Sequence, residues 1–284
     1  MSDRCYRSEL IGLFGYPVDE NPTVVIMEAA FKALNLDYRY NTTSVKPEDL
    51  DTAVKALKAF NMKGTHITVP HKIEVMKYLD HIADDAQMIG AVNTVYLKDG
   101  ETYGENTDGK GFIISLKEGN IDIIGKHVVI LGAGGAAHAI AIELALHGVE
   151  SIIIVNRNES KGRELTSRLN TYSKVKTEFV LWDKIFSIPS DTDLIVNATS
   201  VGLYPDKSKP SIDYNTLDKS MIVCDIIPNP PQTPFLDEAI KAGCHTFDGF
   251  SMLINQAAIS FKLWVGEDAP IQAMREALKK EFDN

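Results

Sequence analysis

The sequence is poor in cysteine and has no long apolar run. Its three cysteines, Cys5, Cys224 and Cys244, are an odd number without metal-ligand spacing, which argues against a disulfide framework or a zinc site. No apolar stretch approaches the roughly 20 residues that a membrane helix requires, and the start of the chain has no signal-peptide pattern. We therefore expect buried thiols in a cytoplasmic protein, with no membrane partner and no bound metal.

The chain also lacks a block of positive charge. Its net charge is −10, and its basic residues are dispersed, which argues against nucleic acid as the main partner. An anionic ligand would need local cations. With 284 residues and 44% hydrophobic content, the chain is long enough for two domains with their own cores.

The most informative stretch is a glycine turn between two predicted strands. An apolar run at 127–131 breaks into Gly132-Ala133-Gly134-Gly135 and then into an alanine-rich helical pattern, followed by a second apolar run at 151–155. This is the strand, tight turn and helix that bind a dinucleotide diphosphate through free backbone N–H groups. A glycine turn without a ligand is the less favoured alternative, because strand, helix and second strand all surround these glycines.

The end of the second strand indicates which dinucleotide binds. NAD sites usually place an acidic residue there, but this chain has Asn156-Arg157-Asn158, with Lys161 and Arg163 just beyond. A guanidinium pairs with phosphate oxygens in a fork geometry, so NADP is favoured over NAD. Alternatively, these charges form the solvated first turn of a helix.

The first hundred residues predict a separate α/β unit. Strands are expected at 10–15, 38–40 and 64–69, with a helix through Met27, Ala30 and Leu34 and another opened by Pro47. Segments 91–97 and 101–106 flank Lys98-Asp99-Gly100, which is a hairpin signal.

From residue 126 onward, strands and helices alternate. Strands near 127–131, 151–155, 177–180, 193–197, 221–225 and 244–247 predict a doubly wound, mostly parallel sheet. Two helices are expected after it, at 251–265 and along Ile271, Met274, Leu278 and Phe282. The fold class is thus α/β with two domains, and a ligand is expected where they face each other.

Polar clusters interrupt the apolar strands of the first unit at predicted strand ends. They are Thr68-Val-Pro-His-Lys72, Gly90-Ala-Val-Asn93-Thr and Asn106-Thr-Asp108-Gly. A lysine beside an aspartate can protonate a carbonyl oxygen as hydride arrives, and can remove the proton in reverse. Taken alone, Lys72 reads as a solvated helix residue and Asp108 as a helix N-cap.

In order along the chain, these motifs resemble the shikimate dehydrogenase family. The resemblance rests on the three clusters above, the glycine turn, Asn156-Arg157, Asn197-Ala-Thr-Ser200-Val-Gly202 and Gly249-Phe-Ser-Met-Leu-Ile-Asn-Gln256. It spans nearly the whole chain. Members reduce 3-dehydroshikimate to shikimate reversibly with NADP, and some use quinate and NAD.

The resemblance implies roles for individual residues and limits for the domains. Lys72 and Asp108 become the catalytic pair, and Thr68, Asn93 and Gln256 are placed around the ring hydroxyls. The expected cofactor-binding residues are Gly132, Ala133, Gly134, Gly135, Ala136, Asn156, Arg157, Lys161, Thr199 and Gly249. The expected domains are 1–109 for substrate and catalysis, 110–248 as a Rossmann domain for NADP, and 249–284 as helices that return to the substrate domain, with a homodimer as one possible assembly.

Four positions depart from the family pattern. The usual Ser-x-Ser-Pro loop, which holds the substrate carboxylate, reads Asn21-Pro-Thr23 here, and a tyrosine that also contacts the carboxylate is replaced by Pro228. His66 stands where the family commonly has asparagine. We still expect Asn21 and Thr23 to contact the substrate.

Two alternatives to an NADP-dependent shikimate dehydrogenase stay open. One is a related dehydrogenase of quinate or another cyclic polyol, since the departures Asn21, Thr23 and Pro228 lie at the carboxylate end. The other is a nucleotide-sensing protein without turnover, although a sensor would need neither Lys72 nor Asp108. Trp182 and Trp264 are expected in the core or at a hydrophobic interface.

Overall fold

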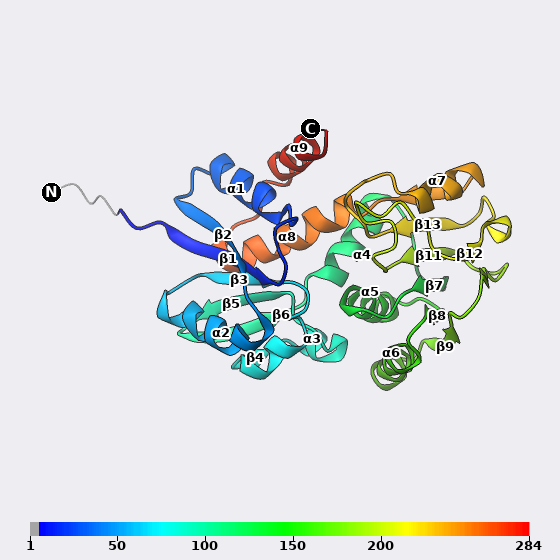
Figure 1. Ribbon diagram of the computed structural model, residues 1–284, viewed down its shortest axis with the longest axis horizontal. Coiled ribbons are helices and arrows are strands. Elements are labelled where there is room, and N and C mark those ends of the chain that lie inside the picture. The colour runs from blue at the N-terminus through cyan, green and yellow to red at the C-terminus, as the bar shows by residue number, and fades with distance from the viewer. Residues whose placement is uncertain (1–5, 284) are drawn as a thin grey trace. The chain divides into compact units, whose positions relative to one another are not determined.

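The computed structural model describes residues 6–283, which form two compact units (Figure 1). The first unit runs to Thr107 and includes Ile254 onward, and the second is Asp108–Leu253. The first unit is therefore built from both ends of the chain. These limits lie close to the expected ones at 109 and 248, and Cys5 lies outside the described residues.

The first unit holds a mixed six-stranded sheet. Its strands, in spatial order, are β2 (Tyr38–Ser44), β1 (Glu9–Gly15), β3 (Gly64–Ile67), β5 (Thr94–Lys98), β6 (Glu101–Glu105) and β4 (His81–Ile82). The pairs β3–β5 and β5–β6 are antiparallel, and the others are parallel. The predicted β5–β6 hairpin is confirmed, because Asp99 and Gly100 adopt the positive φ values, 54° and 81°, that such a turn needs.

Helices cover this sheet. They are α1 (Thr23–Ala33), α2 (Leu50–Ala59), α3 (Asp84–Ile89), the C-terminal part of α8 (Phe250–Val265) and α9 (Ile271–Phe282), with short 3₁₀ turns at Pro47–Asp49 and Glu74–Tyr78. The apolar stripe of α2, Leu50, Val54 and Leu57, is buried in the core of this unit. In Figure 1, α9 lies beside α1, which confirms that the C-terminal helices return to the N-terminal part of the chain.

The second unit holds an all-parallel six-stranded sheet. The spatial order is β14 (His245–Phe247), β13 (Ile222–Asp225), β11 (Leu194–Asn197), β7 (His127–Leu131), β8 (Ser151–Asn156) and β9 (Lys176–Leu181). Its helices are α4 (Asp108–Glu118), α5 (Gly135–Leu146), α6 (Glu159–Tyr172), α7 (Pro234–Lys241) and the start of α8. The strand order reverses at β7, as in a doubly wound sheet that binds a ligand at this switch point. The predicted α/β class is confirmed.

The central strands are apolar because helices bury both of their faces. In β7, Val128 to Leu131 are all buried, which explains the continuous apolar run in the sequence. Helix α5 ends at Leu146, and Gly148 follows with a φ of 87°, which favours glycine. A small parallel pair, β10 (Phe186–Ser187) and β12 (Ile212–Asp213), lies outside the main sheet.

Some elements differ from the sequence expectation. Strand β3 ends at Ile67 and β5 begins at Thr94, both inside the predicted limits, because a polar loop starts at each point. The two-residue strands β4, β10 and β12 are too short to show any periodicity. No helix within residues 6–283 is long and apolar enough to cross a membrane.

Candidate functional site

A buried polar cluster occupies one edge of the sheet in the first unit. The Asn93 side chain accepts a hydrogen bond from the Thr107 amide at 2.8 Å and donates to the Thr107 hydroxyl at 3.0 Å. The Thr94 and Ser260 hydroxyls lie 2.7 Å apart, and Ser260 also lies 3.2 Å from the Thr107 hydroxyl. Gln256 joins through its side-chain oxygen, 3.4 Å from Asn93.

The topology explains why these residues meet. Strands β3 and β6 end, and the antiparallel β5 begins, at the same edge, where the Ile67 amide donates to the Asn93 carbonyl at 2.7 Å. Helix α8 supplies Gln256 and Ser260, one helical turn apart. Each buried polar atom would cost about 1–3 kcal/mol if left unsatisfied, so the network fixes Asn93 and Gln256 in place.

Lys72 and Asp108 are each tethered to this cluster through the backbone. The Lys72 carbonyl accepts from the Val92 amide at 2.8 Å, one residue before Asn93. Asp108 follows Thr107 directly and is the first residue of α4. Asp108 is buried, whereas Lys72 is half-buried. Asp108 belongs to the second unit and Lys72 to the first.

The residues expected to contact the substrate carboxylate lie at the same edge of the first sheet. Strands β1 and β3 are parallel neighbours, and Asn21 and Thr23 follow β1 as Thr68 follows β3. The Asn21 side-chain oxygen accepts from the Thr23 amide at 3.0 Å, and Thr23 is buried. Thr68 is anchored by its amide, which donates to the Phe14 carbonyl at 2.9 Å.

The unusual His66 belongs to the core of the first unit. Its Nδ1 lies 2.6 Å from the Tyr40 hydroxyl, and its ring meets the Trp264 ring edge-on at 4.6 Å. Burial raises the pKa of Tyr40 well above its usual value, so this phenol stays neutral. Trp264 donates to the Val95 carbonyl at 2.9 Å, which confirms the expected core position of Trp264.

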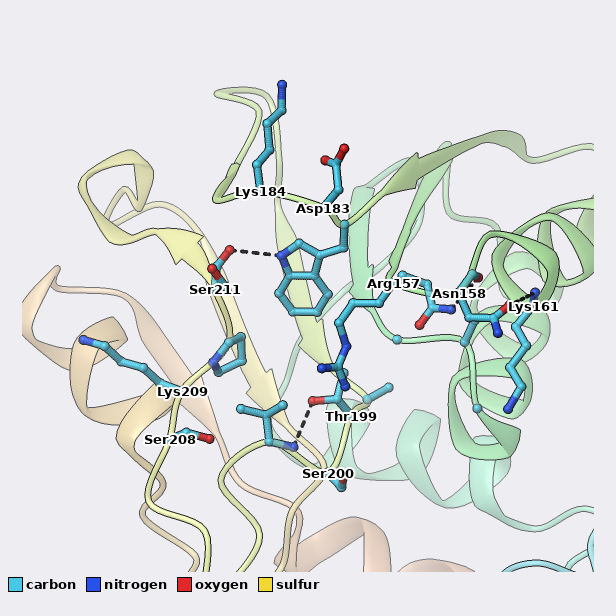
Figure 2. A pocket seen from close by; sticks show the side chains of 18 of the residues that line it. Arg157, Asn158, Lys161, Asp183, Lys184, Thr199, Ser200, Ser208, Lys209 and Ser211 are labelled. Carbon is cyan, nitrogen blue, oxygen red and sulfur yellow. Dashed lines mark hydrogen bonds between the residues drawn. The ribbon is translucent and has the colours of Figure 1, made fainter.

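The second unit contains a pocket of about 830 Å³ at the carboxyl edge of its parallel sheet (Figure 2). It brings together most of the residues expected to bind a cofactor. These are Gly132, Ala133, Gly134, Asn156, Arg157, Lys161 and Thr199. Gly135 and Ala136, in the first turn of α5, and Gly249, before α8, do not line it.

Positions 132 and 134 of the turn are glycine for different physical reasons. Gly132 has a φ of 111°, and a Cβ there would lie 2.8 Å from the Ala198 carbonyl oxygen, so the fold itself requires glycine. Gly134 has an ordinary φ of −90°, and a Cβ there would meet no protein atom within 4 Å. The space above Gly134 is open, as close approach of a diphosphate to the backbone requires.

Cations surround the pocket in a chain of net charge −10. Arg157, Lys161, Lys184 and Lys209 line it together with a single acid, Asp183. Within residues 6–283, Arg157 and Lys161 have no ion-pair partner, and Figure 2 shows Arg157 reaching across the pocket. The nearby Glu159 pairs with Arg163 at 2.7 Å instead. The residues present therefore fit a 2′-phosphate.

A buried carboxylate supports the Thr199 loop. Thr199 donates its hydroxyl to the Asn197 side-chain oxygen at 2.7 Å, and Asn197 donates to Asp225 at 3.1 Å. Asp225 also accepts from the Thr233 hydroxyl at 2.7 Å. Burial raises the pKa of Asp225 to about 6, against the opposing effect of these hydrogen bonds. Pro228 lies half-buried three residues further on.

Some pocket residues were not predicted from the sequence. Trp182, Asp183, Lys184 and Ile185 follow β9, and Ser208 to Ser211 precede β12. The usable signal for 182–185 is their place after a parallel strand, since ligands bind beyond the carboxyl ends of such strands. No such signal marks 208–211. Cys224 and Cys244 are buried free thiols, and residues 6–283 contain no cluster of metal-ligating side chains.

A doubly wound sheet with a glycine turn and a cationic pocket defines a dinucleotide-dependent oxidoreductase. Three family models match this chain. They are the shikimate dehydrogenase substrate binding domain at residues 13–95, shikimate / quinate 5-dehydrogenase at 115–230, and the shikimate 5'-dehydrogenase C-terminal domain at 249–279. The chain belongs to the shikimate/quinate dehydrogenase family.

Individual relatives match over nearly the full length. A shikimate dehydrogenase (NADP(+)) of Methanococcus maripaludis is 40% identical over 97% of this chain and 98% of its own. The ligand-free 5-ketofructose reductase of Gluconobacter sp. strain CHM43 is 44% identical, with a TM-score of 0.92 over 98% of this chain and 100% of its own. A Listeria monocytogenes shikimate 5-dehydrogenase in complex with shikimate and NAD is 32% identical, with a TM-score of 0.90 over 98% and 99%.

Proposed function

We propose that this protein is an NADP-dependent shikimate dehydrogenase, which reduces 3-dehydroshikimate to shikimate reversibly. The observation that carries the proposal is the match of about 40% identity, over both units, to shikimate dehydrogenases (NADP(+)). Arg157, which has no ion-pair partner within residues 6–283, lines the same pocket as the glycine turn and supports NADP as the cofactor. When bound, this cofactor supplies or accepts the hydride.

Lys72 and Asp108 are the proposed acid–base pair. The Lys72 ammonium donates a proton to the ketone oxygen during reduction, and the neutral amine takes it back during oxidation. The Asp108 carboxylate stabilises the charged lysine and orients it. The buried polar cluster described above, here called the Asn93 cluster, consists of Asn93, Thr94, Thr107, Gln256 and Ser260. Asp108 follows Thr107 of this cluster in the chain, and the Lys72 carbonyl accepts from Val92, the residue before Asn93.

The Asn93 cluster is the proposed binding surface for ring hydroxyls. Asn93 and Gln256 carry both donors and acceptors, and Thr68 adds a hydroxyl at the same edge of the sheet. Their fixed positions suit a polyol, because a ligand that cannot satisfy them leaves buried polar atoms unpaired. Asn21 and Thr23, beside Thr68, are the proposed contacts for the end of the substrate remote from the reacting carbon.

A second candidate is the reduction of an uncharged polyhydroxy ketone. It is favoured by the 44% identity to a 5-ketofructose reductase and by three changes at the carboxylate end of the family pattern. Asn21 and Pro228 stand in place of hydroxyl donors, and Thr23 keeps the hydroxyl but adds a methyl group. An amide such as that of Asn21 can donate to a neutral hydroxyl and accept from it, so this end of the site can also bind a substrate without a carboxylate. Quinate is a further carboxylate substrate to compare.

Steady-state kinetics distinguish these candidates. Shikimate, quinate and 5-ketofructose are each tested with NADP(H) and NAD(H), with Lys72→Ala as the background. The proposal expects kcat/KM to be highest for shikimate with NADP. A preference of tenfold or more for 5-ketofructose would establish the second candidate, and binding of NADPH without turnover of any of the three would favour a sensor.

Assembly and location are also proposals. We propose a homodimer in the cytoplasm, where the buried free thiols Cys224 and Cys244 would stay reduced. Light scattering coupled to size exclusion measures the assembly. A mass near that of one 31.4 kDa chain would contradict the dimer.

A further inference from the structure

Trp182 lies beside Arg157 at the ends of two adjacent parallel strands. Its backbone amide donates to the Asn156 carbonyl at 3.0 Å, and the strand register pairs Asn156 with Leu181. The residues that follow each strand, Arg157 and Trp182, both line the pocket. A group bound at Arg157 therefore has an indole as its neighbour.

The orientation of the indole is fixed. Its Nε1–H donates to the Ser211 carbonyl at 3.0 Å, shown as a dashed line in Figure 2. The same oxygen accepts from the Phe186 amide at 3.1 Å, so the small β10–β12 sheet holds the ring. Trp182 also packs against the hydrophobic core cluster that contains Val155. The ring is thus half-buried, and its uncovered part lines the pocket.

We propose that Trp182 is the platform on which the adenine ring of the dinucleotide stacks. In a doubly wound sheet, the ribose next to adenine binds at the end of the second strand, here β8. When the 2′-phosphate of this ribose is bound by Arg157, the adenine attached to the same ribose must lie close to Arg157. Trp182 offers a rigid aromatic face there. Stacking of a base on an aromatic side chain contributes to affinity for any base, because every base has a π-face.

This inference rests on the proposed function, since it requires that the pocket binds NADP. It makes a different claim about residues, however. Arg157 recognises the 2′-phosphate, which only NADP carries, whereas Trp182 recognises adenine, which NADP and NAD share. The two residues should therefore have separable effects on cofactor choice.

Fluorescence tests the contact directly, because the chain has only two tryptophans. In the variant Trp264→Phe, Trp182 is the sole indole, and adding 2′,5′-ADP should quench its emission. Adenine does not absorb where tryptophan emits, so quenching reports contact. The same signal is read without that variant, as the difference between the natural protein and Trp182→Phe.

Affinity measurements by calorimetry complete the test. Trp182→Leu should weaken the binding of NADPH, NADH and 2′,5′-ADP by the same factor, about tenfold. Trp182→Phe should recover most of this lost affinity. Binding of reduced nicotinamide mononucleotide, which has no adenine, should not change, whereas a general collapse of the pocket would weaken it too.

Two results would overturn the inference. If 2′,5′-ADP binds Trp182→Leu as tightly as the natural protein and leaves Trp182 emission unchanged, adenine stacks elsewhere, although the pocket still binds NADP. If the natural protein binds neither NADPH nor 2′,5′-ADP, both the platform and the cofactor assignment are wrong.

Discussion

The Asn197 side-chain amide donates a 3.1 Å hydrogen bond to the carboxylate of Asp225, at the ends of two neighbouring strands. Asp225 has a raised pKa of about 6, because burial outweighs its hydrogen bonds. Protonated Asp225 is therefore favoured in the folded protein relative to the unfolded chain. Between about pH 4 and pH 6, the folded state binds more protons, and its stability falls as pH rises.

The variant Asp225→Asn should remove this dependence. Its amide can keep the hydrogen bonds with Asn197 and Thr233 without a buried charge. We expect the free energy of unfolding of the variant, relative to the natural protein, to rise by roughly 3 kcal/mol from below pH 4 to about pH 7, mostly between pH 4 and pH 6, and then to stay level. Urea unfolding at pH 4, 5, 6 and 7.5 measures it. A constant difference across this range would show that Asp225 does not titrate there.

Replacing Lys72 by alanine should slow the reaction without weakening the binding of the cofactor. A positioned acid–base group contributes on the order of 100-fold or more to kcat, since it acts only as charge develops on the substrate oxygen. The dissociation constant of NADPH should stay within about twofold. Lys77→Ala is the control, because Lys77 is exposed and pairs with Glu74. Near-normal kcat in Lys72→Ala would exclude the assigned role.

Replacing Arg157 by alanine should change cofactor preference. Loss of a charged hydrogen bond costs about 1.5–3 kcal/mol, which should weaken the binding of NADP roughly 10- to 150-fold and leave the affinity for NAD unchanged. Arg163→Ala is the matched control, since its guanidinium is already paired with Glu159. Calorimetry with both cofactors measures the effect. An equal loss for NAD and NADP would point to a structural role for Arg157.

The two turn glycines should respond differently to alanine. Gly134→Ala should leave the melting temperature almost unchanged, since its methyl group meets no protein atom, but weaken NADPH about tenfold or more because it occupies the space of the diphosphate. Gly132→Ala should destabilise the fold by about 1–3 kcal/mol through its positive φ and the clash with the Ala198 carbonyl. Unchanged NADPH affinity in Gly134→Ala would argue against a diphosphate there.

Changing Asn21 and Thr23 to serine tests the remote end of the substrate. Two small hydroxyls donate to a carboxylate, so the double variant should have a lower KM for shikimate with less effect on kcat. Serine at position 21 can still accept from the backbone amide of residue 23, as Asn21 does in the natural protein, and thermal melting verifies the fold. No gain with shikimate, together with good turnover of 5-ketofructose by the natural protein, would instead support the uncharged ketone.

Strong local signals made much of the fold predictable from the sequence. The apolar strand 127–131 and its glycine turn each have one stable local structure, and Asp99-Gly100 matches one turn type. The proposed cofactor pocket follows from them, since parallel strands bring Asn156, Arg157 and Thr199 to one edge.

Contacts between distant segments could not be predicted in this way. His66 depends on Tyr40 and Trp264, which come from another strand and from the last third of the chain. A tryptophan after a strand also indicates a core residue, and the bond of Trp182 to the Ser211 carbonyl, 29 residues away, is a long-range contact that the local sequence does not show. The sequence points to Asn93, but Ser260, which bonds to its neighbours Thr94 and Thr107, has no local signal.

Because the first unit takes residues from both ends of the chain, it is completed last during synthesis. When the ribosome has added Leu253, the second unit is whole, but Phe31 still lacks Phe261, on which its ring stacks at 5.9 Å. A chain that stops there would expose the apolar faces that α8 and α9 cover, a target for chaperones and proteases. A truncated chain should therefore be degraded before it accumulates as a protein that binds the cofactor but cannot catalyse the reaction.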